Sequence, residues 1–127
     1  MRKLPIKKLT ELFVKRQEIH TVLVYGSVAK ARVRQSSDID FAILLSEKPK
    51  DGFVYASKLG AVLEDQCGRE TDILILNSAS PHIAFRAIKE GKMIYQKKNR
   101  SLWNAFVVKT ISMNEDMEIL YRKVSRG

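Results

Sequence analysis

Two short apolar runs, separated by small polar and acidic residues, constrain the fold of this chain more than any other feature. The first run, 21–25, leads into Gly26 and Ser27, and the second, 41–45, follows directly after the triplet Asp38-Ile39-Asp40. Runs of this length bounded by Gly, Ser and Asp predict two buried strands, which we place at 20–25 and 38–45. Because alternate residues of a strand point to the same face, Asp38 and Asp40 present their carboxylates side by side.

Such a carboxylate pair predicts a cation. Like charges this close repel each other, and burying them is costly unless a positive charge lies between them. A site made only of oxygen ligands favours a hard divalent ion, and Mg²⁺ commonly brings nucleotide phosphates with it. Gly26 and Ser27 supply a tight turn where backbone N–H groups and a hydroxyl can meet those phosphates.

The rest of the chain predicts helices and two further strands around this pair. Helical spacing, capping residues and short apolar runs place helices at 5–18, 53–66, 81–90 and 100–123, and strands at 71–76 and 93–95. We therefore expect an α/β (α+β) fold in which a small mixed sheet of about four strands is flanked by helices. At 127 residues the chain is expected to form a single domain, 1–127, with its core at about 20–96.

A third carboxylate is expected to join the first two. The strand at 38–45, the helix at 53–66 and the strand at 71–76 form a crossover unit, which makes the two strands parallel. Their starts then lie at the same end of the sheet, where Asp72 meets Asp38 and Asp40. The short excursion from 26 to 38 predicts an antiparallel first pair, which brings Gly26 and Ser27 to the same end. Glu70 shares the strand parity of Asp72 and is the alternative third acid; we favour Asp72 because it lies deeper in the strand.

Composition and charge limit the partners of this chain. The net charge of +9 favours anionic partners, but no base-reading motif accompanies it, so no specific nucleic-acid binding is predicted. No apolar run approaches the roughly 20 residues that span a bilayer, and no apolar segment of a signal peptide follows the basic start. We therefore expect a cytoplasmic protein without a membrane segment. The apolar stripe of the helix at 100–123 predicts packing on the sheet, or in part an interface for a partner or for an oligomer.

The quoted residues resemble the nucleotidyltransferase superfamily of the DNA polymerase β type, whose signature is G-S, a spacer, D-x-D and a later third acid. The ten-residue spacer, 28–37, resembles that of the minimal nucleotidyltransferases (MNT), and the resemblance covers about residues 20–96. It implies a palm-like fold in which Gly26 and Ser27 hold the β- and γ-phosphates of ATP. It also implies that Asp38, Asp40 and Asp72 are catalytic and bind two Mg²⁺ ions.

The spacer departs from the common family pattern G-S-R-A-R-G. Val28 lacks the basic group, Lys30 keeps a positive charge for the nucleotide without a guanidinium group, and Ala31 lacks the freedom of glycine. These departures concern the handling of phosphate and leave the carboxylates unchanged.

The resemblance also implies a function. Free-standing MNT proteins are typically antitoxins that transfer AMP from ATP to a tyrosine of a HEPN ribonuclease toxin and so silence it. The alternatives are a non-catalytic antitoxin that masks its partner stoichiometrically, and nucleotidyl transfer to a small molecule such as an aminoglycoside.

Overall fold

The computed structural model describes residues 4–26 and 38–126, without the side chains of 117, 118, 120, 121 and 124–126. Ser27, Val28, Lys30 and Ala31 lie outside the described residues. The described helices and strands follow one another along the chain in the predicted order. The extent of the domain, 1–127, stays a prediction.

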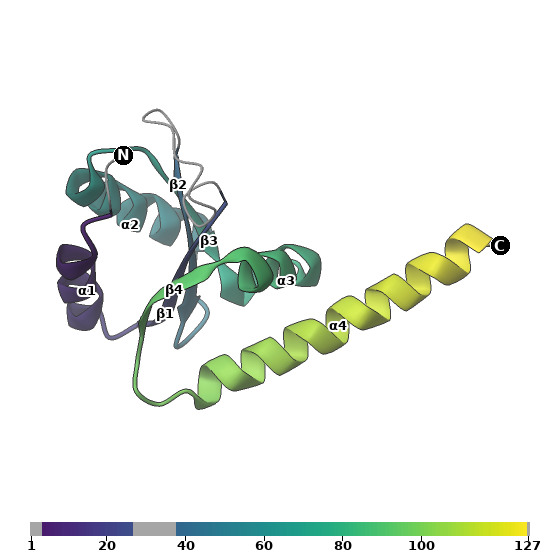
Figure 1. Ribbon diagram of the computed structural model, residues 1–127. Helices are drawn as coiled ribbons and strands as arrows, with labels where there is room; N and C mark the ends of the chain where they lie inside the picture. Colours follow the sequence, from purple (N-terminus) through teal and green to yellow (C-terminus); the bar gives the residue numbers. More distant parts are fainter. Residues whose placement is uncertain (1–3, 27–37, 127) are drawn as a thin grey trace.

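A four-stranded mixed sheet forms the centre of the molecule (Figure 1). Its strands are β1 (Ile19–Tyr25), β2 (Ile39–Leu45), β3 (Thr71–Ile75) and β4 (Lys92–Gln96), in the order β3-β2-β1-β4. β1 is antiparallel to both β2 and β4, whereas β2 is parallel to β3. The expected α/β class, the antiparallel first pair and the parallel second pair are confirmed.

The helices are α1 (Ile6–Lys15), α2 (Gly52–Cys67), α3 (Pro81–Glu90) and α4 (Ser101–Arg126), and a short 3-10 turn, Leu76–Ser78, follows β3. The Asp51 carboxylate accepts the N–H of Val54 at the start of α2, and Gly68 ends this helix at a φ of 67°. The Ser80 hydroxyl caps α3 in the same way, with Pro81 at the first helical position. β3 ends one residue before the predicted boundary because Leu76 begins the 3-10 turn.

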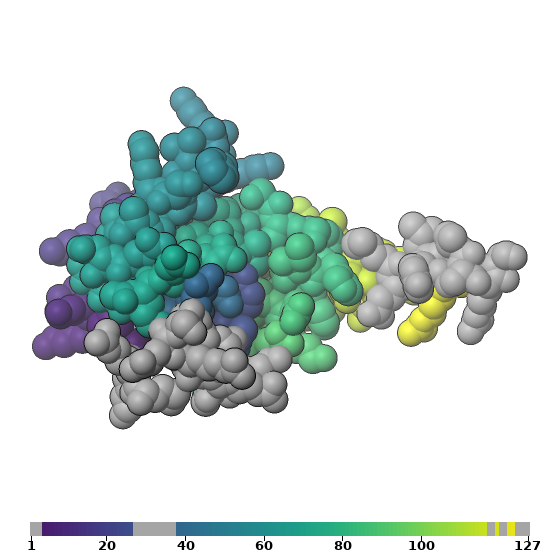
Figure 2. Space-filling view, turned by 90° about the horizontal axis from the view of Figure 1, so that it is seen from above, coloured from purple at the N-terminus to yellow at the C-terminus, as the bar shows by residue number. Residues whose placement is uncertain are grey.

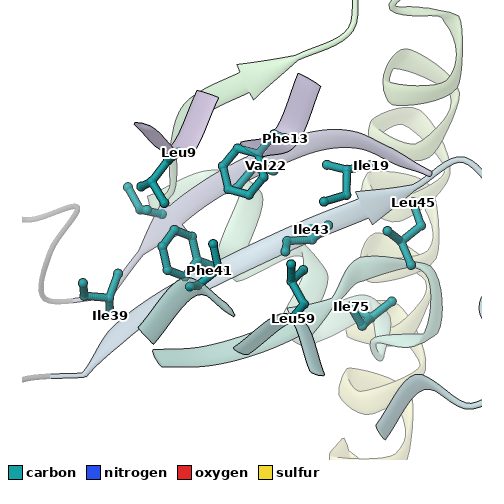
Figure 3. Close-up of a cluster of buried hydrophobic side chains, with 12 residues drawn as sticks. Leu9, Phe13, Ile19, Val22, Ile39, Phe41, Ile43, Leu45, Leu59 and Ile75 are labelled. Carbon is teal, nitrogen blue, oxygen red and sulfur yellow. The ribbon is translucent and has the colours of Figure 1, made fainter. Parts of the chain in front are cut away.

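The larger hydrophobic core lies between one face of the sheet and the helices α1 and α2 (Figure 3). Alternate side chains of β2, including Phe41 and Ile43, point to this face and are fully buried. α1 contributes Leu9 and Phe13, and α2 contributes residues such as Leu59. This core fixes β2 and β3 against α2, and so fixes the ends of both strands.

A smaller core covers the opposite face of the sheet. Leu23 and Leu44 pack there with Ala84 and Ala87 of α3, and Trp103 and Phe106 from the start of α4 complete it. The molecule therefore has three layers, with α1 and α2 on one side of the sheet and α3 and the start of α4 on the other (Figure 1).

α4 leaves the sheet instead of packing on it along its whole length. Its contact with α3 follows a face on which Thr110 and Asn114 are buried, whereas Met113 of the predicted stripe is 41% exposed. A helix of 26 residues extends for roughly 39 Å, far more than the ten residues of α3 can cover. The C-terminal part of α4 accordingly projects from the body in both views (Figures 1 and 2). The prediction that the stripe packs on the sheet is confirmed for Trp103 and Phe106 and is wrong for Met113, whereas the alternative of a partner interface along part of the stripe stays a prediction.

A hydrogen-bond chain fixes the connection between β4 and α4. His20 is buried and its Nε2 lies 2.7 Å from the carbonyl oxygen of Asn99, so Nε2 carries a proton because a carbonyl can only accept. Its Nδ1 lies 2.7 Å from Thr21 Oγ1, which also accepts from Gln96 Nε2 at 3.2 Å. His20 thus has a structural role in the described structure. Within the described residues, no helix has the length and apolar character needed to cross a membrane.

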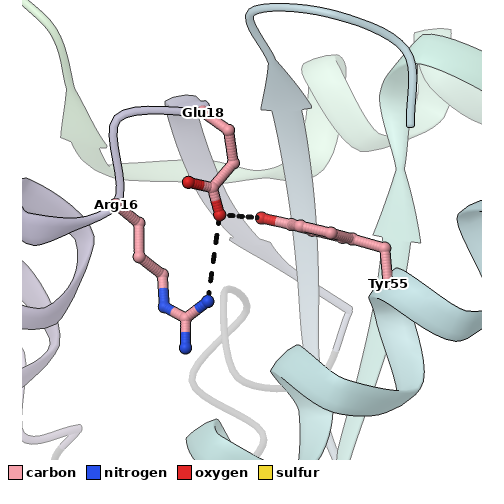
Figure 4. Close-up of polar contacts among 3 residues, drawn as sticks. All are labelled: Arg16, Glu18 and Tyr55. Carbon is pink, nitrogen blue, oxygen red and sulfur yellow. Dashed lines mark hydrogen bonds and ion pairs between the residues drawn. The ribbon is translucent and has the colours of Figure 1, made fainter. Parts of the chain in front are cut away.

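A second polar contact joins the turn before β1 to α2. The Tyr55 hydroxyl donates to Glu18 Oε2 at 2.8 Å, and Arg16 Nη1 lies 3.8 Å from the same oxygen (Figure 4). Burial, followed by the hydrogen bond and the charge of Glu18, raises the pKa of Tyr55. The contact therefore favours the protonated hydroxyl.

Candidate active site

The strand register places a tyrosine and two carboxylates in one row across the sheet. Asp40 of β2 pairs with Tyr25 of antiparallel β1 on one side and with Asp72 of parallel β3 on the other. Neighbouring strands lie about 4.8 Å apart, so these are adjacent positions on three consecutive strands. The structure thus brings Asp40 and Asp72 together as the topology predicted.

The row lies on the face of the sheet that α3 covers. Asp40 has the strand parity of Leu44, and Tyr25 has the parity of Leu23, both of which belong to the smaller core. Asp40 is half-buried and Asp72 is exposed. Hydrophobic residues therefore support the row from within the sheet, while its carboxylates remain open to a ligand.

Gly26 follows this row directly and has a backbone conformation that favours glycine. Its φ of 71° lies in the left-handed region, which side chains of L-residues rarely adopt. A Cβ at this position would also overlap Oδ2 of Asp40. The backbone of the turn therefore lies close to the central carboxylate, which suits a turn that meets an anion or a metal-bound ligand.

The carboxylates around Asp40 repel one another. Burial raises the pKa of Asp40, and the charges of Asp72 and then Asp38 raise it further. Asp38 precedes β2 and is exposed, yet it is near enough to act on Asp40. The register places Asp72 directly beside Asp40, and the choice of Asp72 over Glu70 as the third acid stays a prediction.

Tyr25 and Arg86 belong to the same neighbourhood, and sequence reasoning missed both. Burial raises the pKa of Tyr25 to about 12, with the charges of Asp40 and Asp72 adding to the shift and Arg86 opposing it. Arg86 stands on α3, where its Nε lies 3.3 Å from Glu90 Oε2. The signal for Tyr25 was its position as the last strand residue before Gly26; Arg86 had no local signal because tertiary packing brings α3 to this face.

The other residues predicted to bind the nucleotide are not all described by the structure. Ser27 and Lys30 lie outside the described residues, and their roles stay predictions. Among the residues that the structure describes, no three Asp, Glu, His or Cys side chains form a group that could hold a metal ion. The row therefore supplies neighbouring carboxylates, and metal binding by them stays a prediction.

Comparison with known proteins agrees with this arrangement. The family model described as polymerase beta, nucleotidyltransferase matches residues 7–100 of the chain. The protein adenylyltransferase MntA of Aphanizomenon flos-aquae (strain 2012/KM1/D3) is 27% identical over 106 residues, which cover 76% of this chain and 67% of that protein.

Solved structures show the same fold over almost the whole chain. A chain from the crystal structure of a toxin–antitoxin with AMP-PNP matches with a TM-score of 0.82 and 22% identity, covering 97% of both chains. A chain from the complex of a tri-AMPylated Shewanella oneidensis HEPN toxin with its MNT antitoxin matches with a TM-score of 0.76 and 22% identity, covering 99% of this chain and 97% of that one. The fold, the carboxylate row and the family match over 7–100 together show that this chain belongs to the polymerase beta nucleotidyltransferase family.

Proposed function

We propose that this chain is a Mg²⁺-dependent adenylyltransferase that moves AMP from ATP to a protein hydroxyl, a tyrosine of a HEPN ribonuclease partner, and so acts as its antitoxin in the cytoplasm. The observation that carries the proposal is the pairing of Asp40 with Asp72 beside the left-handed turn at Gly26. Neighbouring carboxylates next to an anion-binding turn are what metal-assisted nucleotidyl transfer requires.

The chemistry of the donor set fits Mg²⁺. Asp40 is crowded by the charges of Asp72 and Asp38, and a divalent cation bound at Asp40 and Asp72 would relieve the repulsion. Asp38, Asp40 and Asp72 would hold Mg²⁺, and the family resemblance implies two ions. When bound, Mg²⁺ would neutralise phosphate charge and polarise the oxygens around the α-phosphorus.

Residues of the chain would also bind the phosphates and accept the proton of the acceptor hydroxyl. The Gly26 backbone and the Ser27 hydroxyl would hold the β- and γ-phosphates, with Lys30 adding a positive charge. The acceptor oxygen attacks the α-phosphorus and forms a new O–P bond, while the bond between that phosphorus and the bridging oxygen breaks and pyrophosphate leaves. The proton of the acceptor hydroxyl passes to the carboxylate of Asp72.

The relatives support AMP as the transferred group and a toxin as the acceptor. The similar protein of Aphanizomenon flos-aquae is a protein adenylyltransferase, and the structural relatives include an antitoxin complex with an AMPylated HEPN toxin. The ATP analogue AMP-PNP in another relative supports ATP as the donor.

The position of the label in ATP tests the reaction directly. With Mg²⁺ and a candidate HEPN partner, ATP labelled at the α-phosphate should label a tyrosine of that partner, and ATP labelled at the γ-phosphate should not. Asp38→Ala combined with Asp40→Ala should abolish the labelling, whereas Asp65→Ala, an exposed acid on α2, should leave it unchanged. Labelling that survives the double substitution contradicts the site.

A further inference from the structure

The outer edge of β3 is open to an additional strand. In the described sheet, β3 is an end strand that pairs with β2 alone. The N–H of Ile39 donates to the Glu70 carbonyl at 2.9 Å, so Glu70 and Asp72 present their backbone groups to β2. The N–H of Thr71 instead points outward, where it donates to Glu64 Oε1 at 3.2 Å. By the same alternation, the N–H and C=O of Ile73 face away from β2.

A groove runs along this open edge between β3 and α2. It has a volume of about 410 Å³, and its β3 side consists of Thr71, Asp72 and Ile73. Its α2 side is made mostly of small residues, which leave room beside the strand: Ala56, Ser57, Gly60 and Ala61. Phe53 stands at its rim and is 82% exposed. The backbone edge is therefore accessible, and an apolar side chain is available to cover what lies on it.

The charge of the groove indicates which class of molecule can bind there. Glu64 and Asp72 line it, and none of its lining residues in the described part of the chain is a lysine or an arginine, although the whole chain carries a net charge of +9. A nucleic acid would be repelled here, whereas an extended protein segment that is neutral or basic would not. Backbone hydrogen bonds to a sheet edge give such segments affinity without a fixed sequence.

We propose that the acceptor protein docks by adding an extended segment to the edge of β3, with the hydroxyl-bearing residue opposite Asp72. This inference rests on the proposed function and names the form of its protein substrate. Side chains opposite each other on adjacent strands lie about 5 Å apart on the same face, so the acceptor side chain lies beside Asp72 on the face that holds Asp40. The residues before and after it point to the other face, over Ser57 and Ala61, next to Phe53.

Hydrogen exchange at single amides tests the docking edge. The amide of Ile73 should exchange rapidly in the free protein and about tenfold more slowly in the complex with the HEPN partner and AMP-PNP, because one new backbone hydrogen bond protects it. The amides of Asp72 and Leu74, which face β2, should be protected in both states. An Ile73 amide that exchanges equally fast in the complex overturns the inference.

A substitution that fills the groove gives an independent test. Ala61 is exposed and lines the groove, whereas Gln66 is exposed on the same helix outside it. Ala61→Arg should lower the rate of AMP transfer at limiting partner by about tenfold, the effect of losing one or two backbone hydrogen bonds, while Gln66→Arg should leave the rate unchanged. Both variants should unfold at the wild-type temperature and bind ATP normally. Wild-type transfer by Ala61→Arg overturns the inference.

These results separate the docking mode from the reaction. Protection of Ile73 in a complex that transfers no AMP would contradict the proposed function and leave the docking edge in place. Normal AMP transfer with an unprotected Ile73 amide would contradict the docking edge and leave the proposed function in place.

Discussion

At Gly26, both the backbone conformation and the closeness of the Asp40 carboxylate favour glycine. Its positive φ disfavours residues with a side chain, and a Cβ at this position would displace the Asp40 carboxylate. A second glycine, Gly68, has nearly the same φ at the end of α2, on the other side of the sheet. The two positions share the conformational cost of substitution and differ in their relation to the carboxylates.

We expect Gly26→Ala to lose both stability and nucleotidyl transfer. The left-handed backbone costs about 1–2 kcal/mol with a side chain, and the displaced Asp40 carboxylate should reduce transfer to background. Gly68→Ala should lose a similar amount of stability in thermal unfolding and keep its transfer activity. If Gly26→Ala transferred AMP at the rate of Gly68→Ala, the close approach of Gly26 to Asp40 would have no functional meaning.

The carboxylate row should destabilise the metal-free protein. The pKa of Asp40 is higher in the folded protein than its ordinary value of 3.8, so ionised Asp40 at neutral pH works against folding. Asp40→Asn should therefore raise the unfolding temperature without Mg²⁺ by about 2–4 °C, while Asp65→Asn should not. Mg²⁺ should stabilise the wild type and not Asp40→Asn, because an ion that binds only the folded state adds to its stability.

That comparison is made by thermal unfolding in the presence of a chelator and then of Mg²⁺. Equal stabilisation of both proteins by Mg²⁺ would place the ion elsewhere and contradict the assignment of Asp40 as a ligand.

At the scale of elements, the contact between Tyr55 and Glu18 joins α2 to the turn before β1, and α2 in turn supports β3. Tyr55→Phe removes one hydrogen bond and keeps the ring, so it should cost about 1 kcal/mol in chemical unfolding at neutral pH. Because the pKa of Tyr55 is raised above 10.0 in the folded state, this stability is complete below pH 10.0 and is lost as the pH rises beyond it.

The wild type should therefore lose more stability than Tyr55→Phe between pH 9 and pH 11, values that bracket the ordinary tyrosine pKa of about 10. Some loss should remain in the variant, because burial also raises the pKa of Tyr25, to about 12. Parallel stability curves for the two proteins across this range would contradict the contact.

At the scale of the whole molecule, the sequence predicted the sheet and the meeting of Asp40 with Asp72. Both follow from local rules: Asp51, Gly68 and Ser80 delimit the helices, and the crossover through α2 forces β2 and β3 to be parallel. The strand parity of the acids then fixes the face on which they lie.

The parts that could not be predicted depend on packing between distant segments. The stripe of α4 looked continuous, but the buried face that contacts α3 reaches only as far as Asn114 among the described side chains, and periodicity alone does not say where a helix leaves the body. Arg86 acts on Tyr25 only because α3 folds across the sheet. The groove along β3 likewise comes from small residues of α2 that meet an end strand, which no local pattern announces.

The stoichiometry of toxin silencing tests whether this chain acts by catalysed AMP transfer, since it separates catalysis from masking. The HEPN partner, in large molar excess over this chain, is incubated with Mg²⁺ and ATP, and its ribonuclease activity is followed over time. We predict that all of the partner is silenced by repeated AMP transfer, and that Asp40→Asn silences none beyond its own molar amount. Silencing by the wild type that stops at a fixed molar ratio of partner to chain would contradict this prediction.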